Sequence, residues 1–288
     1  MGGSRITNKI HKIVNEGHTI IENIEIANAF AKNFASASSN ENYEESFKST
    51  RPEREQILLT QAFTAKQKED GLCFPFLENE LENVLTVRKN TAPGPDRVSY
   101  QMLRNMPADC LKKILTFLNK TWKRGECPAS WKHSIVIPIL KPGKPGDQTA
   151  SYRPISMTCN LCKIMERMIA NRLRWWLESK KLLTEVQSGF RRRRSTTDCL
   201  LRLHDDAYKG VTNKRYTVAA FLDFEKAYDM VWREGLIHKL SQLGITGNML
   251  KWIHSFLVNR TFQVRINNTL SDIFRFRDRA IFVALKKR

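Results

Sequence analysis

The sequence contains no long apolar run, and none of its apolar stretches approaches the roughly 18 residues that a membrane-spanning helix needs. The N-terminal stretch Met1–Thr7 lacks the apolar core of a secretory signal peptide. Gly2 with Ser4 is also a poor match to a myristoylation signal, which wants its hydroxyl residue further on. We therefore expect an intracellular protein, nuclear or cytoplasmic, that is neither secreted nor held in a membrane.

Cysteine is scarce, with six residues among 288, and no internal repeat is apparent. In an intracellular protein such cysteines are most simply reduced thiols. Cys159 and Cys162 have the spacing of zinc ligands, but no second pair matches them. Both fall in a helical pattern, where thiols serve as small core residues, so we expect no structural zinc.

Positive charge is abundant and unevenly distributed. The chain holds 48 Lys/Arg against 29 Asp/Glu, a net charge of +19. Residues 1–90 hold 11 and 13 of these, a net of −2, and residues 91–288 hold 37 and 16, a net of +21. Such a basic region attracts polyanions, and nucleic acid is the first candidate. An anionic membrane surface is the alternative, but the basic residues are spread over several elements rather than along one amphipathic helix.

Periodicity predicts a mixture of helices and strands. Apolar residues three or four apart predict helices over 1–36, 77–90, 98–124, 158–178, 226–244 and 247–258, and over a segment that Ser195-Thr-Thr-Asp198 opens as a capping box. That last helix should bury Leu200, Leu201, Leu203, Ala207 and Tyr208, and Lys163 should lie on the outer side of the 158–178 helix. Alternation predicts a strand over 133–140, and about 151–155 reads as the strand that returns beside it. The continuous apolar run over 218–222 predicts another strand, and residues 262–274 read as a hairpin. Residues 36–56 read as a polar linker or surface loop, and Pro93-Gly94-Pro95-Asp96 as a turn.

The run Val218–Leu222 carries the most informative pattern. This run is an expected strand, and the carboxylate of Asp223 stands at its end. The aromatic residue Tyr228 follows five residues after Asp223. A strand end is rigid, and a carboxylate is a hard oxygen ligand of the kind that Mg²⁺ prefers. A polymerase palm presents a metal-binding aspartate in this way. The alternative is an ordinary buried strand in which Asp223 caps the following helix.

Five ordered blocks carry a family resemblance. They are Asn90-Thr-Ala-Pro-Gly-Pro-Asp96, Trp131–Lys144, Ser151-Tyr-Arg-Pro-Ile-Ser156, Gln187–Asp198 and the Asp223 segment. With these blocks in this order, most of the chain resembles the reverse transcriptase of a non-LTR retrotransposon, of the jockey-like type found in arthropods. Relatives usually have glycine after the aspartate of the first block, where this chain has Arg97.

The resemblance implies an RNA-directed DNA polymerase, a nucleotidyltransferase, with an α/β fold of the α+β polymerase type. It implies a helical connector over 1–90, fingers over 91–215 and a partial palm over 216–288. The implied cofactor is Mg²⁺, acting in a two-metal mechanism. The implied partners are an RNA template, a DNA primer and deoxynucleoside triphosphates.

The resemblance also assigns site residues. Asp223 is the expected catalytic metal ligand, the backbone carbonyl of Phe224 a further metal ligand, and Tyr228 the aromatic that packs under the sugar. Lys141 and Arg153, on the two sides of a hairpin, are expected to fold onto the incoming triphosphate and to face the same cleft as Asp223, because cationic groups bind phosphate oxygens. A core role for Tyr228 and solvated loop charges for the two cations are the alternatives.

Four consecutive cations, Arg191, Arg192, Arg193 and Arg194, stand before the capping box. They could neutralise several phosphates of a nucleic acid, with binding that weakens as salt rises. A nuclear-localisation patch and a solvated charge run are the alternatives.

The resemblance stops after Phe274, and no Asp-Asp pair follows Asp223 in the sequence. Reverse transcriptases take their other metal ligands from such a pair on a later hairpin. We therefore expect a truncated and catalytically incomplete copy. A remnant that only binds nucleic acid is the alternative function. A metal nuclease is a third possibility, but no cluster of His, Asp and Glu in the sequence supports it.

Overall fold

The structure, a computed structural model, describes residues 10–15, 17–37, 39, 41, 43–65, 71–87, 91–224, 227 and 231–276. The chain divides into two compact units, one of residues 1–170 with 226–288 and the other of residues 171–225. Helices and strands are mixed, as expected for the predicted α/β class. The division into connector, fingers and palm at residues 90 and 215 stays a prediction.

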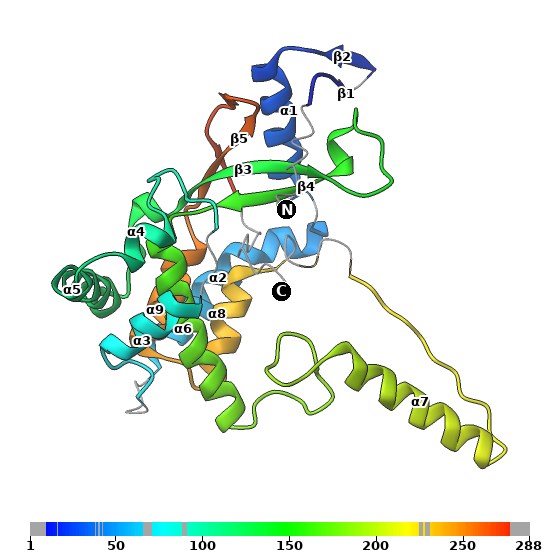
Figure 1. Ribbon diagram of the computed structural model, residues 1–288. Helices are drawn as coiled ribbons and strands as arrows, with labels where there is room; N and C mark the ends of the chain where they lie inside the picture. The colour runs from blue at the N-terminus through cyan, green and yellow to red at the C-terminus, as the bar shows by residue number, and fades with distance from the viewer. Residues whose placement is uncertain are drawn as a thin grey trace. The chain divides into compact units, whose positions relative to one another are not determined.

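A mixed sheet organises the first unit, with strand order β4-β3-β5-β6 and β7 also paired to β5. β3 runs antiparallel to β4 and parallel to β5, and the pair of β3 and β4 is drawn in green in Figure 1. These strands confirm the predictions over 133–140 and 151–155 and the hairpin over 262–274. Their bounds are β3 His133–Leu140, β4 Tyr152–Met157, β5 Thr261–Ile266, β6 Thr269–Leu270 and β7 Phe274–Arg275.

One face of this sheet is covered by helix α1, Asn23–Ser36. Alternate strand residues such as Val136 and Val264 point to that face, since successive side chains of a strand lie on opposite sides. They form a core with Phe30 of α1, whose ring meets the edge of Tyr152 at a centroid distance of 4.9 Å. The opposite face of the sheet therefore receives the other set of strand residues.

The N-terminal prediction was wrong in part, because the helix begins only at Asn23. Two short strands, β1 (Ile13–Asn15) and β2 (His18–Ile20), instead pair antiparallel ahead of it. Gly17, at φ 81°, permits the tight turn that reverses the chain there. The predicted linker over 36–56 was also wrong, since α2 (Glu45–Thr64) occupies much of it. Polar residues such as Glu, Lys and Arg are good helix formers, so polarity alone does not indicate a loop.

The other helices of the first unit are α3 Glu78–Val87, α4 Tyr100–Arg104, α5 Ala108–Arg124, α8 Arg233–Gln242 and α9 Gly247–Leu257. α2 packs on α8, α8 on α9, and α9 on α5. The predicted helix over 98–124 is split at Pro107, whose missing N–H suits a position at the start of α5. The helix expected from 226 begins at Arg233 instead, while residues 225, 226 and 228–230 lie outside the described residues.

The predicted Pro93–Asp96 turn docks on the start of α6, Asn160–Ser179. The thiol of Cys159 donates to Asp96 Oδ2 at 2.7 Å, and Asn160 Nδ2 donates to the carbonyl of Val98 at 2.7 Å. Burial raises the pKa of the Cys159 thiol to about 12, so this thiol keeps the proton that it donates. All six cysteines are free, as predicted. Lys163, expected on the outer side, is instead buried and donates to Asn160 Oδ1 at 3.1 Å.

The second unit contains the C-terminal half of α6, a loop over 180–195, α7 (Thr196–Thr212) and the extended residues 215–224. The capping box at the start of α7 is confirmed, because Ser195 and Asp198 bond reciprocally. The predicted buried side of α7 is wrong, since the helix has no buried residue. Within the described residues, no helix has both the length and the apolar character needed to cross a bilayer.

Candidate nucleotide and nucleic-acid sites

The segment that ends in Asp223 is extended but is not a strand. Residues 215–224 pair with no other strand among the described residues, and Val218, Phe221 and Leu222 are 93%, 83% and 89% exposed. The predicted strand was therefore wrong for this structure. An apolar run supplies the propensity for a strand, but a strand forms only where a neighbour satisfies its backbone hydrogen bonds.

Asp223 and Phe224 are both exposed at the end of this segment, and Phe224 is 81% exposed. Tyr228, the expected sugar-packing aromatic, lies outside the described residues. No group of three or more His, Cys, Asp or Glu in the described part of the chain is arranged to hold a metal ion. The described residues around Asp223 therefore do not by themselves fit a two-metal centre.

The expected triphosphate cations lie on the β3–β4 hairpin. Arg153 pairs with Ile139 across the two strands, and its neighbour Tyr152 pairs with Leu140. Tyr152 belongs to the core under α1, so the alternation of the strand turns Arg153 to the opposite, outer face. Arg153 is exposed there, and its guanidinium makes no hydrogen bond or ion pair within the described residues. Its position suits the binding of an anion.

Lys141 begins the loop that joins the two strands and is half-buried. Its backbone N–H donates to the carbonyl of Ser151, and its Nζ donates to the carbonyl of Ala150 at 2.9 Å. The loop is further tied by Tyr152, whose hydroxyl donates to the carbonyl of Gly146 at 2.7 Å. The ammonium of Lys141 thus has a partner within its own loop. Whether Lys141, Arg153 and Asp223 share one cleft stays a prediction.

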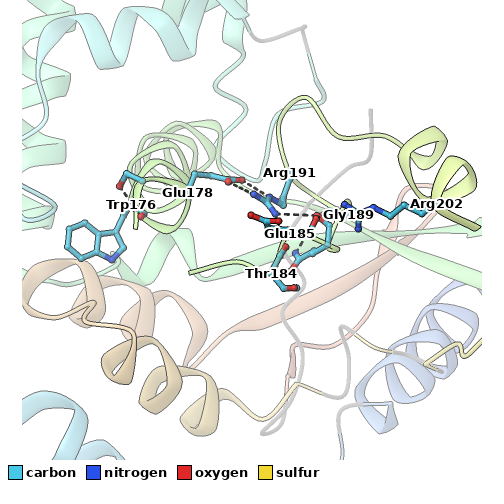
Figure 2. A network of polar contacts seen from close by, with 9 residues as sticks. Trp176, Glu178, Thr184, Glu185, Gly189, Arg191 and Arg202 are labelled. Atoms are coloured by element: carbon cyan, nitrogen blue, oxygen red, sulfur yellow. Dashed lines mark hydrogen bonds and ion pairs between the residues drawn. The ribbon is translucent and has the colours of Figure 1, made fainter. Parts of the chain in front are cut away.

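The four arginines of the 180–195 loop have different environments. Arg191 Nε donates to Glu178 Oε1 at 2.8 Å, and its Nη2 donates to Glu178 Oε2 at 2.5 Å (Figure 2). Its Nη1 donates to the carbonyls of Thr184 and Gln187, at 2.8 and 3.4 Å. The Arg191 side chain is only 12% exposed. The guanidinium of Arg191 therefore already binds α6 and its own loop, and the prediction that it also contacts nucleic acid stays untested.

Arg192 and Arg193 are exposed, and Arg194 is half-buried. The hydrogen bonds from Arg191, followed by the charges of Arg191, Arg194 and Arg174, hold the pKa of Glu178 below its usual range. Burial, together with the charge of Arg192, lowers the pKa of Arg174. These arginines thus lie close enough to act on one another. Glu178 was missed in the sequence because it stands 13 residues before Arg191, with no periodic relation to it.

The comparisons with known proteins agree with the expected family. Residues 139–279 match the family described as "Reverse transcriptase (RNA-dependent DNA polymerase)". That segment starts at the end of β3 and includes Arg153, the 180–195 loop and Asp223. It runs to residue 279, so the expectation that the resemblance stops after Phe274 was wrong by a few residues.

Three relatives from fruit flies extend the match. The chain is 36% identical over 182 residues to the RNA-directed DNA polymerase from mobile element jockey of Drosophila melanogaster, covering 63% of this chain and 20% of that protein. It is 32% identical over 197 residues to the jockey polymerase of Drosophila funebris, covering 68% and 21%. It is 33% identical over 195 residues to the "Probable RNA-directed DNA polymerase from transposon BS" of Drosophila melanogaster, covering 68% and 21%. The chain belongs to the reverse transcriptases of non-LTR retrotransposons, and it spans about a fifth of the length of these relatives.

Proposed function

We propose that this chain is the part of an RNA-directed DNA polymerase that grips the RNA template and the triphosphate of the incoming deoxynucleotide. The observation that carries the proposal is Arg153, an exposed guanidinium with no partner among the described residues, on the outer face of a hairpin inside the segment that matches reverse transcriptases. A guanidinium presents several N–H groups in a planar fork, which suits the oxygens of a phosphate.

Lys141 is the second cation of the nucleotide site in this proposal. Its Nζ is bonded to a carbonyl of its own loop, so a triphosphate would have to replace that one bond. The exposed arginines of the 180–195 loop bind the phosphates of the template, without reading its sequence. Such contacts release counterions, so the affinity should fall steeply as the salt concentration rises. A template, a primer and an intracellular location, nuclear or cytoplasmic, belong to the same proposal.

Asp223 is the proposed ligand of a divalent metal ion, and Mg²⁺ is the ion that fits a hard carboxylate with substrate phosphates. The backbone carbonyl of Phe224 and the ring of Tyr228 keep their expected roles as metal ligand and sugar-packing group. Among the described residues, no group of three or more His, Cys, Asp or Glu is arranged to hold a metal ion, so no catalytic step is assigned to the ion.

Photo-crosslinking with a radiolabelled thio-substituted deoxynucleoside triphosphate tests the nucleotide site. Arg153→Ala should lose most of the label. Arg54→Ala is the matched control, because Arg54 is an exposed arginine on α2 outside the matched segment, and it should label like the wild-type chain. Equal labelling of all three proteins would refute the nucleotide site.

A chain that only binds nucleic acid is the second candidate, favoured by the absence of a metal cluster among the described residues. The two candidates differ in the labelling experiment. A nucleic-acid binder should retain RNA without taking up the nucleotide label, whereas a polymerase domain should do both.

A further inference from the structure

The 180–195 loop is held in a shape that its own backbone does not favour. Phe190 and Arg193 have left-handed backbone conformations, with φ 63° and 58°. For a residue other than glycine, such a conformation is strained and persists only where the surroundings enforce it. Arg191, which joins the loop to α6, lies between these two strained residues. Phe190 directly precedes it, and Arg193 follows two residues later.

Arg191 makes contacts that can enforce this shape. Its fork closes on the carboxylate of Glu178 near the end of α6, and its Nη1 holds two carbonyls within the loop. One guanidinium thereby connects the helix end with two separate points of the loop, as the dashed lines of Figure 2 show. On the other side of the loop, Arg202 of α7 donates to the carbonyl of Glu185 at 3.0 Å.

The charges around Glu178 make its role testable. Glu178 lies close to Arg174, Arg191 and Arg194 in the described structure. If it were only one charge among others, it would repel a polyanion, and its removal would strengthen RNA binding. If it holds the loop, its removal lets the strained residues relax, and the neighbouring arginines lose their arrangement.

We propose that Glu178 and Arg191 are positioning residues, whose bidentate ion pair holds the 180–195 loop so that Arg192, Arg193 and Arg194 meet the phosphates of single-stranded RNA. The proposal rests on the proposed function for RNA binding. In this proposal Arg191 holds the loop in place and does not itself bind the RNA. The acidic residue Glu178 is then necessary for the binding of a polyanion.

The test compares two substitutions that remove the same charge. Glu178→Gln breaks the bidentate pair. Glu185→Gln is the control, because Glu185 is an exposed acid of the same loop that acts on Arg191 through its charge alone and makes no ion pair within the described residues. Arg191→Lys adds a variant that keeps the positive charge but loses the planar fork. Binding of the full chain to a fluorescently labelled oligouridine is measured by anisotropy over a range of salt concentrations.

Glu178→Gln and Arg191→Lys should weaken the binding several-fold, and the slope of log affinity against log salt should decrease by about 1 for each arginine that no longer reaches a phosphate. Glu185→Gln should bind as tightly as the wild-type chain or slightly more tightly. Limited trypsin digestion should cut after Arg192, Arg193 and Arg194 faster in the two weakened variants than in the control. All four proteins should melt at similar temperatures, since the pair lies at a loop.

Two outcomes would contradict the positioning role of Glu178 and Arg191. If Glu178→Gln binds RNA as tightly as Glu185→Gln and is cut at the wild-type rate, the ion pair does not position the loop, while the proposed RNA binding stands. If the wild-type chain binds no RNA even at low salt, the proposed template grip is wrong, and the positioning role falls with it.

Discussion

Gly94 allows the turn at Pro93–Asp96 to lie directly against the junction of β4 and α6. A Cβ atom placed on Gly94 would lie 2.5 Å from the carbonyl carbon of Thr158, 2.5 Å from the nitrogen of Cys159 and 2.7 Å from the carbonyl oxygen of Thr158. All three are backbone atoms, which cannot rotate away as a side chain would. Gly94→Ala must therefore push the turn off the junction.

The expected loss follows from these contacts. Inserting a methyl group into a packed site costs roughly 1–3 kcal/mol, and the upper end applies where the neighbours are backbone. Displacing the turn also weakens the hydrogen bonds from Cys159 to Asp96 and from Asn160 to Val98, each worth about 1 kcal/mol net. We expect a loss of about 3 kcal/mol in the free energy of unfolding, which lowers the melting temperature by roughly 5–10 °C at this chain size.

Urea denaturation followed by circular dichroism measures this loss, with Gly146→Ala as the matched control. A Cβ on Gly146 meets its nearest atoms, Tyr152 Oη and Leu140 Cδ2, at 3.6 and 3.9 Å, which are ordinary contacts. The control should stay within about 0.5 kcal/mol of the wild-type chain. A Gly94→Ala variant with the same urea midpoint as Gly146→Ala would refute the docking of the turn.

Further predictions concern stability and activity. Arg97 is exposed at φ 57°, so Arg97→Gly should raise the stability by about 1 kcal/mol, and a lower urea midpoint would contradict the strain argument. Burial raises the pKa of Glu234, so the native state holds this proton more tightly, and the stability falls as the pH rises from the usual glutamate range through the raised pKa. Glu234→Gln should therefore be more stable than the wild-type chain at neutral pH and lose that advantage in acid, whereas a pH-independent difference in urea midpoint would count against it. Phe30→Ala should cost about 3–5 kcal/mol, because this fully buried ring fills the core between α1 and the sheet, and a loss below 1 kcal/mol would show that the core is not packed as described. The polypeptide of these 288 residues should extend no primer on an RNA template with Mg²⁺, because its sequence has no Asp-Asp pair after Asp223, and extension that Asp223→Ala abolishes would overturn this expectation.

Local sequence patterns predicted those parts of the fold that local interactions determine. The capping box of Ser195 and Asp198 starts α7 as expected, because its partners lie within one turn. The alternation in 133–140 predicted β3, and the position of Arg97, where the family resemblance implied glycine, has the left-handed backbone that glycine favours.

The predictions that failed concerned partners that are distant in the sequence or that the described residues do not provide. The run before Asp223 has the composition of a strand but no neighbouring strand in the described part of the chain. α7 has an apolar side that no described residue buries. The four consecutive arginines looked equivalent, yet Arg191 is bound to Glu178, an acid that no local rule connects with it. A sequence shows which residues can make a contact, but it does not show which partner is near.

The packing of α1 on β5 has a consequence for how the chain is made. Phe30 of α1 shares its core with Phe262 and Val264 of β5, so the two sides of that core are separated by about 230 residues of chain. During synthesis at about 5–20 residues per second, α1 leaves the ribosome on the order of 10–50 s before β5 does. Throughout that interval the apolar side of α1 has no β5 to cover it. The nascent chain therefore exposes the apolar side of α1 early. We expect chaperones that recognise apolar segments to bind α1 until β5 emerges.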